Sequence, residues 1–280
     1  MSQLKKDLIV TGIPRGGTTL TAALIDNLSN CVCLSEPGWQ TKWFLNGKNA
    51  NNLTKQVTDD FKEIRKKILN NEPIKDKRNV DGTASTNYFN SPKNGVRQKD
   101  KTFKKRSVVL PVKDKHFTLG IKHNAHYTSI LPELIESEKF SIIAIVRDPV
   151  PTILSWLSLD IPISRGRLPA AEGVWSELRD ITESKEELLI KQVKIYDLFC
   201  QRYLEYQDHI HLIKYEDIVK DPSIINKLTG MEYERKLDLE NQNKNKYYDF
   251  KMEEKIREAI TKHAPHALKL YPFKKKKEKE

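Results

Sequence analysis

Three glycines, an arginine and two threonines stand close together near the start of the chain, in the stretch Asp7 to Leu24 that reads DLIVTGIPRGGTTLTAAL. A short apolar run precedes them and an apolar pattern at helical spacing follows, which predicts a strand, a glycine-rich turn and a helix in that order. Such a turn leaves backbone N–H groups unpaired at the start of the helix, where the positive end of the helix dipole adds to their field. The stretch therefore predicts an anion site, and specifically a phosphate cradle.

Gly12 and Gly17 have the spacing of a Walker A loop, but Thr18 stands where a nucleotide triphosphatase has its lysine. A Walker lysine contacts the β- and γ-phosphates beside a magnesium ion. Here the cation of the loop is Arg15 instead. The loop therefore disfavours ATP hydrolysis and kinase chemistry, and it favours a smaller anion held by Arg15, Thr18 and Thr19.

An arginine and a serine in the segment IIAIVRDPVPTILSWL form a second candidate anion site. Arg147 follows Phe140 to Val146, the most hydrophobic run of the chain, which predicts a buried central strand. Ser155 lies in a helix that we expect to begin near Val150, because Pro151 suits a first helical turn. A guanidinium at the end of a strand and a hydroxyl on the following helix can converge on one anion.

A third candidate follows a predicted strand. Glu36 comes shortly after the β-prone segment Cys31 to Leu34, and Lys122 follows the apolar run Phe117 to Ile121. Ligands of open parallel sheets bind at the carboxyl ends of the strands, so Glu36 is a candidate for a site. A surface ion pair or a helix cap is the alternative role for Glu36.

Taken together, these segments resemble the bacterial-type sulfotransferases of the P-loop superfamily, which use 3′-phosphoadenosine 5′-phosphosulfate (PAPS) as sulfuryl donor. The segment PRGGTTL is similar to their 5′-phosphosulfate loop. The resemblance implies that the donor is bound by a set of loop residues, namely Arg15, Gly16, Gly17, Thr18 and Thr19.

The same resemblance extends to later segments. In the family, an arginine and a serine at the spacing of Arg147 and Ser155 bind the 3′-phosphate of the donor. The segment HLIKYEDIVKDP is similar to the family's Tyr-Glu-Asp segment, which implies that Tyr215 lies near the adenine. An aromatic ring can stack on a base, and core packing is the alternative role for this tyrosine.

The segment IKHNAHYTSILPELI resembles the family's Lys-Thr-His segment. The resemblance places Lys122 beside the bridging oxygen of the leaving phosphate, where it and Arg15 stabilise the transferring group. In the cytosolic branch the general base is a histidine two residues after that lysine, but this chain has asparagine at position 124. In other branches the base is a glutamate shortly after the first helix, where Glu36 falls. We therefore expect Glu36 to be the base, with His123 and then His126 as alternatives.

The resemblance implies an α/β fold with a central parallel β-sheet flanked by helices, the P-loop NTPase-like sulfotransferase fold. We expect one domain over residues 1–273, with a mobile insert at 91–115 and a basic disordered tail at 274–280. Amphipathic patterns predict further helices at Thr128 to Ser137 and Glu172 to Glu205, and Asn241 to Lys246 reads as a polar loop.

The implied function is transfer of a sulfuryl group from PAPS to a hydroxyl or amine of a small-molecule, carbohydrate or lipid acceptor, without a metal. A P-loop small-molecule kinase is one alternative, and a non-catalytic module that binds a nucleotide or a polyanion is the other. The net charge of +11 suits a polyanionic ligand, but no nucleic-acid-binding motif accompanies it.

Composition excludes several other classes of protein. The longest clean apolar run, Ile142 to Val146, is far below the roughly 20 residues that cross a bilayer. The first predicted strand begins too early to leave room for a signal peptide, so we expect a cytoplasmic protein. Three cysteines without paired metal spacing predict reduced thiols and no structural metal. The oligomeric state is not predicted.

Overall fold

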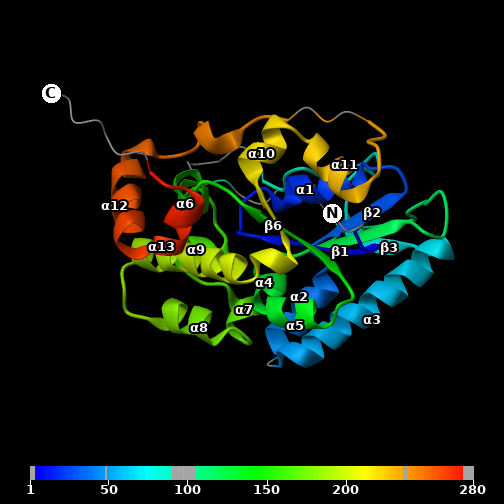
Figure 1. Ribbon diagram of the computed structural model, residues 1–280, viewed down its shortest axis with the longest axis horizontal. Coiled ribbons are helices and arrows are strands. Elements are labelled where there is room, and N and C mark those ends of the chain that lie inside the picture. The colour runs from blue at the N-terminus through cyan, green and yellow to red at the C-terminus, as the bar shows by residue number, and fades with distance from the viewer. Residues whose placement is uncertain are drawn as a thin grey trace.

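Five parallel strands form the main sheet, in the order β2-β5-β1-β6-β7 (Figure 1). The computed structural model describes residues 4–47, 49–89, 97, 105–235, 237 and 239–273. The strands are β1 (Asp7–Gly12), β2 (Cys31–Ser35), β5 (Thr118–Lys122), β6 (Ser141–Val146) and β7 (His211–Lys214). The predicted α/β class with a central parallel sheet is confirmed.

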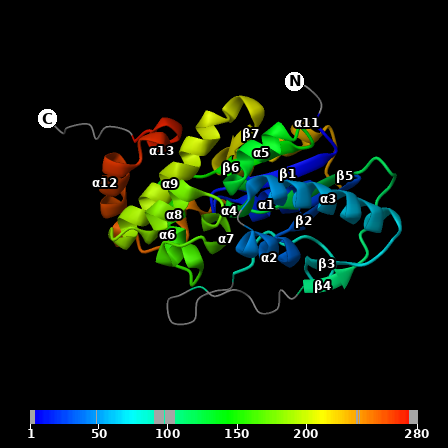
Figure 2. The same ribbon diagram turned by 90° about the horizontal axis from the view of Figure 1, so that it is seen from below.

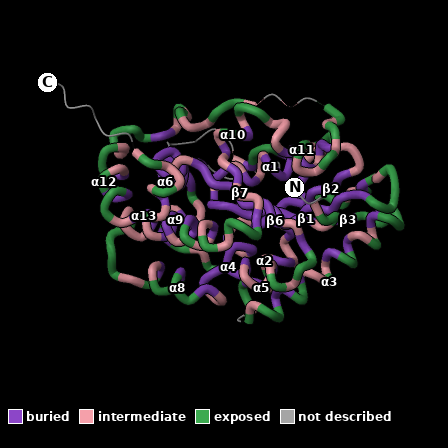
Figure 3. The backbone as a smooth tube through the Cα atoms, in the orientation of Figure 1, coloured by how far each residue is buried: buried purple, intermediate pink, exposed green. Residues whose placement is uncertain are grey.

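Alternating side chains of the strands enter two hydrophobic cores, one on each face of the sheet. In β1, Leu8 and Val10 belong to one core and Ile9 to the other, and β6 alternates in the same way. A strand buried on both faces reads as a continuous apolar run, which is why β6 was recognisable from sequence. Figure 3 shows the sheet as the buried centre of the molecule, with exposed backbone at the rim.

Helices cover both faces of the sheet (Figure 1). The first core contains side chains of α1 (Thr18–Asp26), α10 (Tyr215–Lys220) and α11 (Ser223–Thr229). The second core contains side chains of α3 (Ala50–Leu69), α5 (Leu131–Glu136), α6 (Pro149–Leu157), α9 (Leu188–Glu205) and α12 (Glu253–His263). The other α-helices are α2 (Gly38–Asn46), α4 (Ala125–Ser129), α7 (Pro169–Glu172), α8 (Ser176–Glu183) and α13 (Pro265–Leu270). Short 3₁₀ turns are η1 (Pro162–Arg165), η2 (Gln207–His209), η3 (Gln242–Lys244) and η4 (Phe250–Met252).

The segment from Glu172 to Glu205 is helical, as predicted, but it is divided into the end of α7 and then α8 and α9. The chain folds back so that α8 packs against α9, with the rings of Trp175 and Phe199 5.2 Å apart between centroids. This packing buries Trp175 and Leu178 completely, which one straight helix could not do. The helix predicted at Thr128 to Ser137 is likewise divided, between α4 and α5.

A two-stranded antiparallel sheet lies beside the main sheet, below α2 and α3 in Figure 2. Its strands are β3 (Ile74–Lys77) and β4 (Lys105–Val108). β4 falls inside the insert predicted at 91–115, so residues 105–108 form a strand, while most of 91–104 lies outside the described residues. The predicted tail at 274–280 also lies outside them. Within the described part of the chain, no helix has the length and apolar character needed to span a bilayer.

A buried ion network attaches β3 to the main sheet. The guanidinium of Arg78 contacts Asp26 at 2.6 Å and Asp76 at 3.0 Å, and the side chains of all three residues are less than 10% exposed. Asp26 accepts a hydrogen bond from the backbone of Cys33 in β2, and Asp76 accepts one from Ser35. Because side chains alternate along a strand, Lys77 between Asp76 and Arg78 points the other way. The network therefore fixes where Lys77 lies.

Candidate active site

The residues selected from sequence gather at one edge of the main sheet, at the carboxyl ends of the strands. Glu36 follows β2, Lys122 ends β5, Arg15 lies in the loop after β1, Arg147 follows β6 and Tyr215 follows β7. Because all five strands are parallel, these side chains meet although they are far apart in sequence.

The glycine-rich loop is held in place from three sides. The N–H of Ile13 donates to the carbonyl of Ile145 at 3.0 Å, and the indole of Trp156 donates to the carbonyl of Pro14 at 2.7 Å. The guanidinium of Arg147 donates to the carbonyl of Arg15 at 3.1 Å. No side chain among the described residues caps the start of α1, so its first N–H groups remain available to an anion.

Gly17 is required for two reasons, because its φ is +98° and an added Cβ would lie 2.5 Å from Cδ2 of Tyr215. We expect Gly17→Ala to lower the free energy of unfolding by about 1–3 kcal/mol, from backbone strain together with displacement of the ring. Gly82→Ala is the matched control, because Gly82 has a φ of +81° but open space around it. Urea denaturation of both variants tests the difference, and equal losses would show that the contact with Tyr215 is unimportant.

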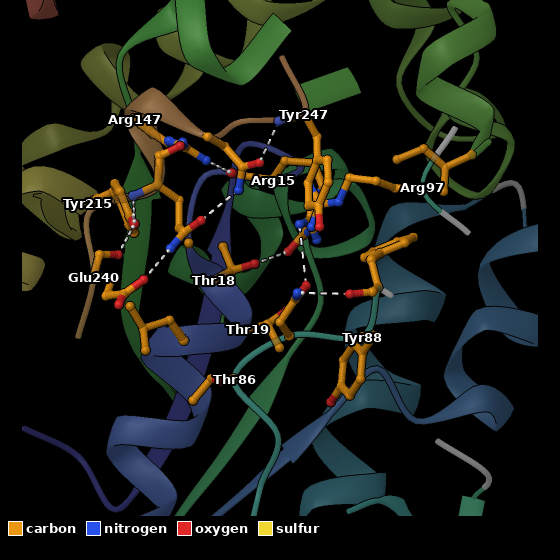
Figure 4. Close-up of a pocket in the computed structure, with 18 of the residues that line it drawn as sticks. Arg15, Thr18, Thr19, Thr86, Tyr88, Arg97, Arg147, Tyr215, Glu240 and Tyr247 are labelled. Carbon is orange, nitrogen blue, oxygen red and sulfur yellow. Dashed lines mark hydrogen bonds between the residues drawn. The ribbon is translucent and has the colours of Figure 1, made fainter. Parts of the chain in front are cut away.

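A cavity of about 680 Å³ lies above the loop and brings together three arginines, Arg15, Arg97 and Arg147 (Figure 4). Burial, followed by the charge of Arg97, lowers the pKa of Arg15 to about 10. The aromatic side chains that line the cavity are Tyr88, Phe89, Tyr215, Tyr247 and Tyr248. Several guanidinium groups beside aromatic rings suit a ligand that carries both phosphate and a base.

A segment that sequence reasoning treated only as a polar loop closes this cavity. The hydroxyl of Tyr215 donates to the carbonyl of Glu240 at 3.1 Å and accepts from the N–H of Gln242 at 3.0 Å. Arg147 donates to the carbonyl of Gln242 at 2.7 Å and to the side chain of Asn243 at 2.8 Å. The predicted loop therefore forms one wall of the site, fixed by the arginine and the tyrosine that were selected from sequence.

Ser155 does not join Arg147 at the cavity wall. It is fully buried in α6, its Oγ has no hydrogen-bond partner among the described residues, and it is not part of the lining of the cavity. Arg147 itself lines the cavity, with its guanidinium carbon 4.8 Å from the centre of the Tyr215 ring. The structure thus places Ser155 behind the lining of the cavity, and a shared anion site of this pair stays a prediction.

Glu36 lies between two lysines. One carboxylate oxygen is 2.7 Å from Nζ of Lys122 and the other is 2.9 Å from Nζ of Lys77. Burial by itself raises the pKa of Glu36, but the charges of Lys122 and Lys77 outweigh it and hold that pKa well below its usual range. About a third of the Glu36 side chain is still exposed. Glu36 is thus an ionised carboxylate that faces solvent-accessible space.

A second cavity of about 430 Å³ adjoins the first and shares Glu36 and Asn124 with it. Its lining also includes His123 and His126, whose rings stack with centroids 4.4 Å apart. Burial lowers the pKa of His126 to about 4, and burial followed by the charge of His126 lowers that of His123 well below its usual range. Both imidazoles are therefore neutral at physiological pH.

Asn124 connects the glycine-rich loop to this junction. Its side-chain oxygen accepts a hydrogen bond from the hydroxyl of Thr18 at 2.6 Å, and its carbonyl accepts one from Thr11 at 2.8 Å. An amide has no basic lone pair to take a proton at neutral pH, so the side chain at position 124 can position groups but cannot act as a base.

The family model for the sulfotransferase domain matches residues 5–229. The chain belongs to the sulfotransferase family. Among solved structures, it is similar to the sulfotransferase STF1 from Mycobacterium tuberculosis H37Rv, at 12% identity and a TM-score of 0.41, over 93% of this chain and 77% of that one. No curated protein matches this sulfotransferase in sequence.

Several residues of the candidate site were not selected from sequence, namely Lys77, Arg97, Gln242, Asn243, Tyr247 and Tyr248. None belongs to a motif, and none directly follows a strand of the main sheet. Lys77 gave no local signal, because its strand reads IKDK and both Lys and Asp are depleted in strands. In the described part of the sulfotransferase, no group of three or more His, Cys, Asp or Glu side chains is placed to hold a metal ion.

Proposed function

We propose that this sulfotransferase transfers the sulfuryl group of PAPS to a hydroxyl or amine of a small acceptor, with Glu36 as general base. The observation that carries the proposal is the junction of two cavities at Glu36. One cavity is lined by arginines and aromatic rings, and the other by two neutral histidines. A transferase that moves a group between two substrates needs such adjoining sites with a base at their boundary.

The larger cavity is the proposed donor site. The glycine-rich loop, with Arg15, Thr18 and Thr19, holds the 5′-phosphosulfate at the start of α1, where the helix dipole favours an anion. The ring of Tyr215 lies on Gly17 and is available to the adenine. Arg147 holds the loop at 240–248 in place, and this loop forms one wall of the proposed nucleotide site.

The reaction needs one proton transfer and charge stabilisation. The acceptor oxygen attacks sulfur in line, the new O–S bond forms as the S–O bond to the 5′-phosphate breaks, and the acceptor proton passes to Glu36. The products are the sulfated acceptor, adenosine 3′,5′-bisphosphate and a proton. Lys122 and Arg15 stabilise the charge that develops on the leaving phosphate.

Lys122 connects donor binding to the strength of the base. A carboxylate with a strongly lowered pKa is a weak base, because general-base catalysis is most effective when the pKa lies near the working pH. Lys122 is held by Glu36 in this structure. A bound donor competes with Glu36 for the ammonium group of Lys122. When Lys122 contacts the donor instead, Glu36 loses a nearby positive charge, and its pKa rises. Base strength then increases only when there is a sulfuryl group to transfer.

Calorimetric titration with adenosine 3′,5′-bisphosphate, alongside ATP with magnesium, tests the donor assignment. We expect the wild-type protein to bind the bisphosphate and not ATP, and we expect Arg147→Ala to abolish binding, because the variant loses both a cation and the anchor of the 240–248 loop. Arg106→Ala is the control, because Arg106 is exposed and outside the cavity. A preference for ATP with magnesium would instead support a P-loop kinase.

A non-catalytic module that binds polyanions is the remaining alternative. It would show affinity for heparin or DNA that falls steeply with salt, together with no transfer of sulfate from labelled PAPS to any acceptor. The presence of Glu36 between the two cavities favours the enzyme over the module.

A further inference from the structure

We propose that the acceptor is a short neutral oligosaccharide, and that one of its sugar units binds in a third cavity between α2 and α3. The inference rests on the proposed function, because it places the reacting sugar unit in the second cavity, beside Glu36. It follows from the side chains that line the third cavity and from the helix that connects it to the second.

The third cavity has a volume of about 300 Å³ and lies where the end of α2 meets the start of α3 (Figure 1). Its floor is closely packed, because Leu53 is buried and Gly47 leaves no space for a side chain. A Cβ on Gly47 would lie 2.8 Å from Cδ2 of Leu53 and 2.8 Å from the carbonyl oxygen of Trp43. The cavity is therefore built by the close approach of two helices.

Four carboxamide groups and one indole stand around this cavity. The amides belong to Asn46, Asn49, Asn52 and Gln56, and the indole belongs to the half-buried Trp43. The side chain of Asn49 caps α3 by accepting from the N–H of Asn52 at 2.9 Å, whereas the other three amides make no hydrogen bond with a described side chain or backbone group. An amide offers donors and an acceptor side by side, and an indole offers an apolar face. Such a lining suits a sugar ring, which has hydroxyl groups around its edge and C–H groups on its faces.

One helix connects the third cavity to the second. Gly38 and Thr41 of α2 line the second cavity, and Lys42 and Asn46 of the same helix line the third. Gly38, Lys42 and Asn46 are four residues apart, so they follow one stripe of the helix. At a rise of about 1.5 Å per residue, this stripe is about 12 Å long. A ligand that occupies both cavities must therefore be longer than one sugar ring.

The second cavity also suits a neutral sugar. Among the described residues, no Phe, Tyr or Trp lines it, so it lacks the flat apolar walls that would hold an aromatic acceptor. The charged groups of its lining are Glu36 and Lys77, which pair with each other at 2.9 Å, and its two histidines are neutral. The cavity thus offers hydrogen-bonding groups without an uncompensated charge, which favours hydroxyl groups over a carboxylate or a sulfate.

Binding to an array of neutral di- to hexasaccharides tests the site, with labelled protein that is saturated with adenosine 3′,5′-bisphosphate. We expect the wild-type protein to bind a subset of these sugars, and we expect Asn52→Ala and Gln56→Ala to weaken that binding. Asn51→Ala is the matched control, because Asn51 is an exposed amide of the same helix that lies outside the cavity. Trp43→Ala should abolish binding and Trp43→Phe should keep part of it, since a smaller ring still stacks. Trp43 packs partly against the core, so the exposed amide variants test the site without disturbing the fold.

Transfer of labelled sulfate separates the third cavity from the reacting site. With the oligosaccharide that binds best, Asn52→Ala should raise KM about 3- to 10-fold, the range of one neutral hydrogen bond, and should leave kcat close to wild type. With the sugar unit that receives the sulfate offered as a monosaccharide, kcat/KM should equal that of the wild type, because this acceptor does not reach the third cavity. A variant that acted through the fold would change both.

Three outcomes would overturn the inference while leaving the proposed function in place. The first is that protein which binds the bisphosphate binds none of the oligosaccharides. The second is that Asn51→Ala and Asn52→Ala have equal effects. The third is that sulfate passes preferentially to a phenol, an aliphatic alcohol or a tyrosine peptide. Failure of the wild-type protein to bind the bisphosphate, or to transfer sulfate to an acceptor of any class, would contradict the proposed function itself.

Discussion

Glu36→Gln is expected to lower kcat by about 10²- to 10⁴-fold, the contribution of one general base. The amide keeps the shape of the side chain but cannot accept the acceptor's proton. Binding of adenosine 3′,5′-bisphosphate should be kept or become tighter, because Glu36 carries no positive charge toward the phosphates and its replacement frees Lys122 for the donor. The measurement is transfer of labelled sulfate at saturating donor, with calorimetric titration of the same preparations.

Matched variants separate this role from the alternatives. Glu240→Gln changes another carboxylate of the same cavity and should keep its activity. His123→Asn and His126→Asn test the two histidines that sequence reasoning kept as candidate bases. If His123→Asn were inactive and Glu36→Gln active, the assignment of the base would be wrong.

The pH dependence gives an independent check. The pKa of Glu36 lies well below its usual range, and the pKa values of His123 and His126 are lowered as well. The protonation of all three groups in the free enzyme is therefore constant at neutral pH, and kcat/KM should show no fall between about pH 8 and pH 6.

The stability of the fold should also depend on the ionisation of Glu36. Because the folded state lowers the pKa of Glu36, its carboxylate stabilises the fold at pH values above its unfolded-state pKa of about 4.3. This stabilisation is lost as the pH falls through the folded-state pKa. Acid unfolding of Glu36→Gln should accordingly depend less steeply on pH than that of the wild type.

Glu36→Gln also leaves Lys122 buried without its carboxylate partner, so its stability must be measured. The double variant Glu36→Gln with Lys122→Met removes both charges and should recover part of any lost stability, while its activity stays low. Recovery of activity in the double variant would show that the single variant fails through its fold and not through loss of a base.

Arg78→Met is expected to lower the free energy of unfolding by about 3–5 kcal/mol, the cost of breaking a buried ion network by removing one partner. The variant leaves Asp26 and Asp76 buried together without a cation. Burial raises the pKa of Asp76, although the charge of Arg78 acts in the opposite direction. This site is therefore unfavourable for an ionised carboxylate. Because the network fixes β3, the variant should also displace Lys77 from Glu36.

Urea denaturation measures this effect, with Arg257→Met as the control. Arg257 pairs with Glu253 on the surface of α12, where both side chains are more than a third exposed. Exposed pairs of this kind contribute about 0–1 kcal/mol. Similar losses in the two variants would contradict a structural role for the buried network.

The positions of the site residues along the strands were largely predictable from sequence. Apolar runs mark buried strands, and the residue that follows a parallel strand lies at the carboxyl edge of the sheet. Glu36 and Arg147 were selected in this way, Arg15 was selected from the glycine-rich loop, and Lys122 and Tyr215 from the resemblance to the family; all five follow or end strands of the main sheet at that edge. Both the apolar runs and the glycine-rich turn are local signals, so they can be read from a short window of the chain.

Other features depended on contacts that no local pattern encodes. Tertiary packing put Lys77 on Glu36, Arg97 beside Tyr247, and the loop after residue 240 over Arg147, all across long separations in sequence.

Packing also set two further features. The helical segment from Glu172 to Glu205 is divided because α8 folds back onto α9, and Ser155 is buried by the packing of α6. The sequence by itself determined the buried strands and the glycine-rich turn between a strand and a helix, because these follow from local periodicity and spacing, and its resemblance to the family implied the class of fold. Only the tertiary structure decided which charges meet at the carboxyl edge of the sheet, because those contacts depend on how distant segments pack.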